Sequence, residues 1–334
     1  MGIFSKKRKD GTLVTEGDPM IHIMPYVMRG RNESAVYYTN TIDIDHIQKY
    51  IKERRKDGVR LTVFNVIMAA VLQVFHSRPN MNRFVAGRRL YAHHDVEILY
   101  TVKIELNDDS FESVARVKFD ADDNLETVTR QMEEQIALIK AGGEGWDDKL
   151  IRYFSRMPRW FLRSFLGILR WLDFHGLMPK ALIDIIPMYS SMFISHLGSI
   201  GGDSAFHHLY EFGTTSIFMT ISKVYEKPFK TKDGGVEWRK VIDLNFTIDE
   251  RIVDGYYLIK SMKMFNLLLS DMKLLEYSPN ELQKLVDSGE IKFGSSKVVF
   301  NDRQKSIAPL EAIVDQQTEN TQEHTDLLNQ HLEQ

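Results

Sequence analysis

Segments with the pattern of β-strands and segments with the pattern of α-helices follow one another from residue 35 to about residue 273. Runs of aromatic and β-branched residues predict the strands, and capping residues and glycines mark the helix ends. We expect strands at 35–44, 83–91, 95–106, 111–119, 189–196, 214–224 and 236–249 and helices at 45–56, 62–78, 123–141 and 254–273. The length of 334 residues allows one large α/β domain or about two typical domains.

The composition excludes several classes of site. The chain has no cysteine, so a disulfide framework, an iron–sulfur cluster and a cysteine nucleophile are all excluded. Any thiol in the chemistry must therefore arrive on a substrate. The 43 Lys and Arg residues against 46 Asp and Glu residues give a net charge of −3, which argues against a nucleic-acid partner.

The ends of the chain differ in composition from its middle. The first residues lack the apolar run of a signal peptide, and no stretch of 18 residues is apolar enough to span a bilayer. We expect a cytoplasmic protein, with membrane association left open. We predict a flexible N-terminus at 1–20, a single domain at 21–300 with an amphipathic helical insertion at 142–188, and a disordered polar tail at 301–334.

Two segments carry the most information, FISHLGSIGG at 193–202 and FTIDERIVDGYY at 246–257. Together they resemble the acyltransferase catalytic domain of 2-oxoacid dehydrogenase complexes and, more distantly, chloramphenicol acetyltransferase. In that family one strand carries an IS-x-L-G segment and a later strand ends in DHRxxDG. The resemblance implies a chloramphenicol-acetyltransferase-like two-layer α/β sandwich, a mixed sheet with helices on one face, assembled as a homotrimer with its active-site channel between subunits.

The resemblance also implies roles for individual residues. Glu250 stands where the family has its catalytic histidine, which takes a proton from a thiol. Ser195 stands where a serine donates a hydrogen bond to the tetrahedral oxyanion. Asp254 stands at a structural aspartate that pairs with an arginine from the N-terminal region, for which Arg29 and Arg31 are both candidates.

The resemblance therefore implies a free-standing acyltransferase that moves an acyl group between a thioester and an unknown acceptor. Coenzyme A or acyl-CoA is the expected substrate, a lipoyl group is the less favoured one, and no metal is expected. An unperturbed glutamate has a pKa of about 4.3 against about 8.5 for a thiol, so Glu250 needs burial to act as a base. The alternative is a non-catalytic scaffold or ligand-binding protein that has lost the histidine base.

Three histidines are candidates for a substitute base. His196 adjoins Ser195, but successive strand residues point to opposite faces, so a site-facing Ser195 turns His196 away. His207 and His208 are expected to be surface histidines. None of the histidines stands at metal-ligand spacing.

The insertion contains a basic amphipathic pattern at 149–173. On one helix its arginines fall within an arc of roughly 60°, and an apolar group lies opposite, formed by Phe161, Phe165, Ile168, Leu169 and Leu172. Such a segment either contacts an anionic membrane as a peripheral element or packs against its own protein. Both interpretations stay open from the sequence.

Overall fold

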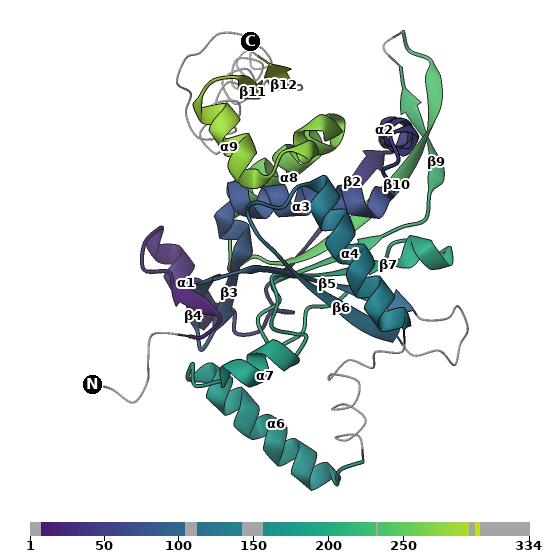
Figure 1. Ribbon diagram of the computed structural model, residues 1–334. Helices are drawn as coiled ribbons and strands as arrows, with labels where there is room; N and C mark the ends of the chain where they lie inside the picture. The colour runs from purple at the N-terminus through teal and green to yellow at the C-terminus, as the bar shows by residue number, and fades with distance from the viewer. Residues whose placement is uncertain (1–7, 104–111, 142–155, 232, 294–297, 301–334) are drawn as a thin grey trace. The chain divides into compact units, whose positions relative to one another are not determined.

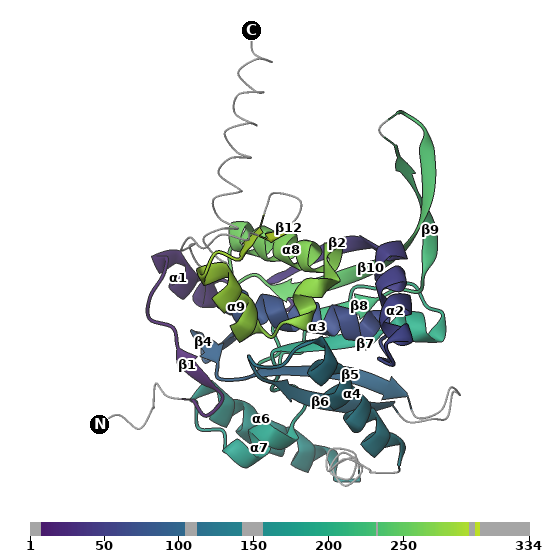
Figure 2. The ribbon, with the colours of Figure 1, turned by 45° about the horizontal axis from the view of Figure 1, so that its top comes forward.

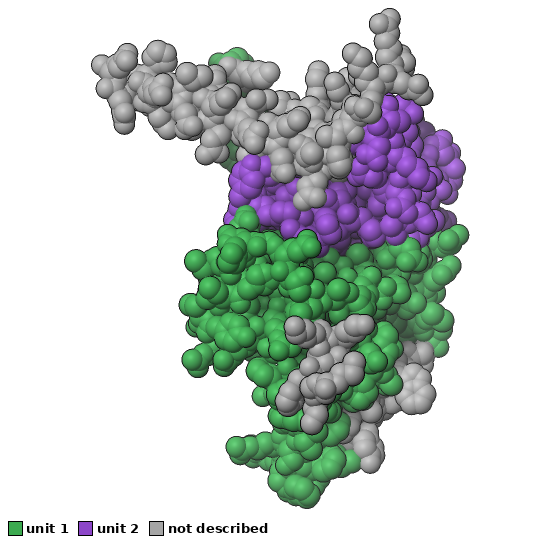
Figure 3. Space-filling view, turned by 90° about the vertical axis from the view of Figure 1, so that its left-hand side faces the viewer, with its two compact units in different colours: residues 1–45, 82–120, 130–254 green, residues 46–81, 121–129, 255–334 purple. Residues whose placement is uncertain are grey.

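The computed structural model describes residues 8–103, 112–141, 156–231, 233–293 and 298–300. The chain divides into two compact units (Figure 3), each assembled from separate stretches of sequence. The first unit comprises residues 1–45, 82–120 and 130–254, and the second comprises residues 46–81, 121–129 and 255–334. The prediction of a single domain at 21–300 stays a prediction.

A mixed sheet forms the centre of the first unit (Figure 1). Its strand order is β2-β10-β8-β7-β5-β6, and β9 pairs with the outer part of β10. The strands β5 and β8 lie parallel to β7, and the remaining pairs are antiparallel. The strands are β2 (Ala35–Asp43), β5 (Val96–Lys103), β6 (Glu112–Phe119), β7 (Met192–His196), β8 (Ile217–Ile221), β9 (Tyr225–Lys230) and β10 (Val236–Asp249).

The long strand β10 has two parts with different surroundings. From Val241 to Asp249 it pairs with β2 and is almost wholly buried. From Val236 to Val241 it pairs with β9, and the two form a hairpin that projects from the sheet (Figure 2). Trp238 is 64% exposed on this hairpin. The sequence pattern did not reveal β9, because four of its six residues are charged or proline.

A small second sheet has the order β1-β4-β3. It consists of β1 (Gly11–Leu13), β3 (Arg83–Ala86) and β4 (Arg89–His93). The single strand expected at 83–91 is therefore a hairpin that turns at Gly87 and Arg88, both with positive φ. The described part of the predicted flexible N-terminus, 8–20, contains β1 and the start of α1 (Pro19–Val27), and Arg8 is buried.

The insertion contributes the helices α6 (Arg159–Phe174) and α7 (Lys180–Ile185) to the first unit. The apolar side of α6 packs on its own protein. Leu169 lies in a buried cluster with Met178, Ile183 and Tyr189, and Phe165 and Leu172 pack against it. Residues 142–155 of the predicted insertion and the predicted tail at 301–334 lie outside the described residues.

The second unit is mainly helical. It contains α2 (Asp45–Lys56), α3 (Val63–Ser77), the first turn of α4 (Leu125–Lys140), α8 (Gly255–Ser270), α9 (Pro279–Asp287) and the hairpin β11 (Ile291–Phe293) with β12 (Val298–Phe300). Thr62 and Ser278 each accept a hydrogen bond from the backbone N–H three residues later, and the side chain there accepts one in return. These capping boxes fix where α3 and α9 begin, and the start of α3 agrees with the helix expected at 62–78.

Candidate active site

Glu250 lies in the turn that follows β10. Its side chain is exposed in the single chain. The backbone of this turn is held firmly, because the N–H of Glu250 donates to the carbonyl of Ser34 at 2.9 Å and the N–H of Asp249 donates to the carbonyl of Ser216 at 2.9 Å. The position of Glu250 is therefore fixed by its neighbours, while its carboxylate faces out of the subunit.

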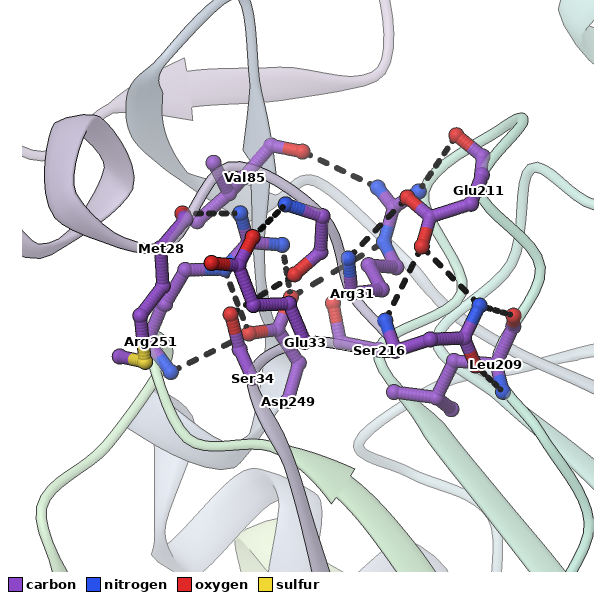
Figure 4. A network of polar contacts seen from close by, with 12 residues as sticks. Met28, Arg31, Glu33, Ser34, Val85, Leu209, Glu211, Ser216, Asp249 and Arg251 are labelled. Atoms are coloured by element: carbon purple, nitrogen blue, oxygen red, sulfur yellow. Dashed lines mark hydrogen bonds and ion pairs between the residues drawn. The ribbon is translucent and has the colours of Figure 1, made fainter.

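Asp249, directly before Glu250, is the centre of a buried charge cluster (Figure 4). Arg251 donates to both carboxylate oxygens, from Nε at 2.8 Å and from Nη2 at 2.7 Å. Nε of Arg31 lies 3.9 Å from Oδ2 of the same carboxylate. The three side chains are at most 4% exposed, so this is a forked ion pair inside the protein with a second cation beside it.

The Nη1 and Nη2 groups of Arg31 donate to backbone carbonyls. Nη2 donates to Val85 at 3.0 Å and to Gly213 at 2.7 Å, and Nη1 donates to Tyr210 and Glu211. Burial lowers the pKa of the Arg31 guanidinium, Asp249 opposes that shift and Arg251 adds to it. Arg31 thus ties the N-terminal region to β3 and to the segment before β8.

This arrangement differs from the predicted brace. We expected Arg29 or Arg31 to pair with Asp254, but the ion pair of Arg31 is with Asp249. Asp254 and Arg29 are exposed, and the backbone N–H of Arg29 donates to Glu33. Sequence reasoning missed the Asp249–Arg251 pair, although the D-x-R spacing across a strand end was a usable signal.

Ser195 lies near the end of β7 and is half-buried. Thr220 of β8 lies opposite it, and Asn245 of β10 lies opposite Thr220. Thr220 donates to the carbonyl of Ala205 at 2.6 Å and Asn245 donates to that of Ser204 at 3.1 Å. Within the described chain Ser195 Oγ has no such partner, so its hydroxyl is available to donate to a ligand.

The three histidines have different surroundings. His196 follows Ser195 in β7, so its side chain belongs to the opposite face of the sheet, and burial lowers its pKa. His207 stacks on Phe218 with ring centroids 4.0 Å apart and on His208 at 4.4 Å. These contacts give His207 a packing role.

The register of the sheet separates Ser195 from Glu250. Ser195 shares a row with Asn245, and Glu250 stands five residues beyond Asn245 on β10. At about 3.4 Å per residue the two rows are about 17 Å apart along the strands. One copy of the chain therefore does not bring the predicted base and the predicted oxyanion donor together.

Comparison with known proteins finds a family match for part of the chain and solved structures of similar fold. Residues 189–276 match the family described as 2-oxoacid dehydrogenases acyltransferase (catalytic domain). A probable dihydrolipoamide acetyltransferase from Listeria monocytogenes superposes with a TM-score of 0.51 at 14% identity, covering 77% of this chain and 95% of that one. The dihydrolipoamide acetyltransferase of Azotobacter vinelandii gives 0.51 at 18% identity, with 78% and 94% covered. No curated protein sequence matches the chain.

The chain is an acyltransferase-fold protein. The predicted fold class, a mixed α/β fold with a mixed sheet, is confirmed. The match at 189–276 includes both segments that the sequence singled out, and therefore both Ser195 and Glu250.

Among the described residues, no three His, Asp or Glu side chains are grouped so that they could hold a metal ion. No described helix has both the length and the apolar character to cross a membrane.

Proposed function

We propose that this protein transfers an acyl group from acyl-CoA to an acceptor, with Glu250 as the base and Ser195 as the oxyanion donor. Glu250 takes the proton of the acceptor as the acceptor attacks the thioester carbonyl. Ser195 Oγ donates to the oxygen of the tetrahedral intermediate. The C–S bond then breaks, and the CoA thiolate leaves with the proton that Glu250 returns.

The match of 189–276 to the acyltransferase catalytic domain carries this proposal. In the Azotobacter vinelandii enzyme a serine, a histidine and an asparagine have roles in the catalytic mechanism, and the last two are four positions apart. In this chain Ser195 precedes Glu250 and Asp254 in the sequence, and Glu250 and Asp254 are likewise four positions apart. The replacement of a histidine by Glu250 is part of the proposal.

We also propose that the site forms between subunits of a homotrimer. Ser195 and Glu250 are too far apart within one chain to act on one carbonyl, so each would need its partner from a neighbouring copy. The exposure of Glu250 in the single chain supports this, because a neighbour could bury it and make it a stronger base. A protein of similar fold forms the cubic core of the pyruvate dehydrogenase complex.

The exposure of Glu250 also favours a second candidate, a non-catalytic scaffold or ligand-binding protein. A carboxylate that stays in water is a poor base for a thiol, since about four pKa units separate an unperturbed glutamate from a thiol. In that case the fold serves to bind an acyl ligand or a partner. The two candidates make opposite predictions for the rate of acyl transfer.

A third role follows from the surface of α6. Its apolar side packs internally, but Trp160 and Trp171 are 72% and 53% exposed, and Arg159, Arg163 and Arg170 are exposed on the same helix. Exposed tryptophans beside arginines are typical of peripheral contact with anionic membranes. This contact is compatible with either candidate function.

Acyl-CoA hydrolysis or transfer assays with several chain lengths test the proposal. Glu250→Gln should lower the rate by roughly 10²–10⁴ and Ser195→Ala by roughly 10²–10³. Glu250→His should keep or raise the rate, because an unperturbed histidine, with a pKa of about 6.5, is a stronger base than an unperturbed glutamate, with a pKa of about 4.3. Equal rates for wild type and all three variants would decide for the scaffold.

A further inference from the structure

A cavity of about 370 Å³ opens beside the buried charge cluster of the first unit. Its lining includes five arginines, Arg29, Arg31, Arg88, Arg170 and Arg251. Only two carboxylates line it, those of Asp173 and Glu211, so the formal charge of the lining is +3. Neither Glu250 nor Ser195 belongs to this lining.

The two carboxylates are already engaged by other groups. Asp173 pairs with Arg8 at 2.7 Å, outside the lining. Glu211 accepts from the backbone N–H groups of Arg31 and Asn32 at 3.1 and 3.0 Å and from the amide of Asn32, and these hydrogen bonds lower its pKa although burial opposes them. Asp173 is thus shared with Arg8, whereas Glu211 keeps its charge and interacts electrostatically with the buried Arg31.

Three of the arginines are unneutralised. Over the described residues, Arg29, Arg88 and Arg170 have no carboxylate within ion-pair distance. All three are exposed, whereas Arg31 and Arg251 are buried. The buried Nε of Arg31 also has no hydrogen-bond acceptor in the described part of the chain. The buried Arg31 and Arg251 share the carboxylate of Asp249, so the three exposed arginines supply the unpaired positive charge of the cavity.

The backbone brings two of these arginines close together. Gly87 lies against the end of α6, where a Cβ atom would meet the carbonyl oxygen of Phe174 at 2.1 Å. Only glycine fits this approach of the β3–β4 turn to the helix. The turn carries Arg88, whose φ is +57°, and α6 carries Arg170. A tight backbone contact therefore sets the two cationic side chains beside the same cavity.

We propose that this cavity binds the phosphate group of a small organic phosphate. Guanidinium groups match phosphate oxygens with paired N–H donors, and their positive charge is retained at any physiological pH. The volume lies at the lower end of small-molecule sites, so it suits a phosphate and a short organic portion. Two sources share this chemistry: the phosphates of CoA itself, or a separate phosphorylated ligand.

Calorimetry with inorganic pyrophosphate on the full chain tests the site. We expect the wild type to bind and its melting temperature to rise with pyrophosphate concentration. The pair Arg88→Gln/Arg170→Gln should weaken binding about tenfold to hundredfold, because charge-assisted contacts are lost. The matched pair Arg159→Gln/Arg163→Gln removes the same charge from exposed positions outside the cavity and should bind like wild type. No binding by wild type, or equal weakening in both pairs, overturns the proposal.

Competition with CoA identifies the source. If the phosphates of CoA occupy the cavity, pyrophosphate competes with CoA and Arg88→Gln/Arg170→Gln weakens both. If a separate ligand uses it, CoA binding is unchanged in that variant while pyrophosphate binding falls. Both results support the phosphate site, and the pyrophosphate measurement stands even if no acyl transfer is found.

Discussion

Ser195 and Glu250 lie in rows about 17 Å apart on the same sheet, although a shared reaction would require them at one carbonyl group. Ser195 lies near the end of β7, which runs parallel to β8, and Glu250 follows β10, which runs antiparallel to β8. Their opposite directions send the two residues toward opposite ends of the sheet. A site that uses both needs two copies of the chain.

Complementation between two inactive variants tests this directly. Ser195→Ala and Glu250→Gln are each expected to be nearly inactive alone. When they are coexpressed in equal amounts and assemble at random, about a quarter of all sites combine an intact Ser195 with an intact Glu250 of the next subunit. We expect about a quarter of wild-type activity. No recovery from oligomers shown to be mixed would contradict a shared site.

The charge cluster around Asp249 makes a prediction about stability. Asp249→Asn keeps the shape of the side chain but leaves Arg31 and Arg251 buried without their carboxylate. We expect the free energy of unfolding to fall by about 3–5 kcal/mol, measured by urea denaturation. The control Asp184→Asn removes an exposed ion pair with Lys180 and should cost about 0–1 kcal/mol. Equal small losses would mean that Asp249 does not brace the fold.

The sequence predicted those parts of the fold that depend on local patterns. The strand 236–249 and the helix that follows Thr62 depend on β-branched residues and a capping residue, which act within a few residues. The turn at Gly87 was missed because nothing in the local sequence marks the approach of Phe174, 87 residues further on.

In the candidate site, too, features that depend on segments distant in the sequence could not be predicted. The resemblance implied catalytic roles for Ser195 and Glu250, which stay predictions, and it assigned the arginine brace to Asp254. In the structure Arg31 and Arg251 both lie at Asp249. A choice between two aspartates five residues apart depends on which one is buried, and burial arises from segments distant in sequence, such as Val85 and Gly213 around Arg31.

The membrane hypothesis for α6 predicts co-sedimentation with anionic vesicles. Trp160→Ala/Trp171→Ala should weaken vesicle binding about tenfold or more, because two large side chains no longer enter the interface. High salt should release the protein, since it screens Arg159 and Arg163. The control Trp238→Ala removes an equally exposed tryptophan from the β9–β10 hairpin and should leave binding unchanged. Binding that is lost equally in the control would point away from α6.

His93 gives the fold a dependence on pH. It is the last residue of β4, its ring lies 4.3 Å from that of Phe84, and its buried Nε2 has no hydrogen-bond acceptor or donor among the described residues. Burial lowers the pKa of His93 to about 4, with Asp10 opposing the shift and Arg8 adding to it. The folded protein therefore keeps His93 neutral at pH values where the unfolded chain is protonated.

The sign of the effect follows from proton counting. Between about pH 6.5 and pH 4 the unfolded state binds more protons at His93 than the folded state, so stability falls as the pH falls. The contribution of neutral His93 is complete above about pH 6.5 and is lost progressively toward pH 4, by up to about 3 kcal/mol. Urea midpoints for His93→Phe should fall less than those of wild type between pH 7 and pH 5. The control His94→Gln, at the exposed neighbouring position, should follow wild type. Parallel curves for His93→Phe and wild type would show that His93 does not carry the acid sensitivity.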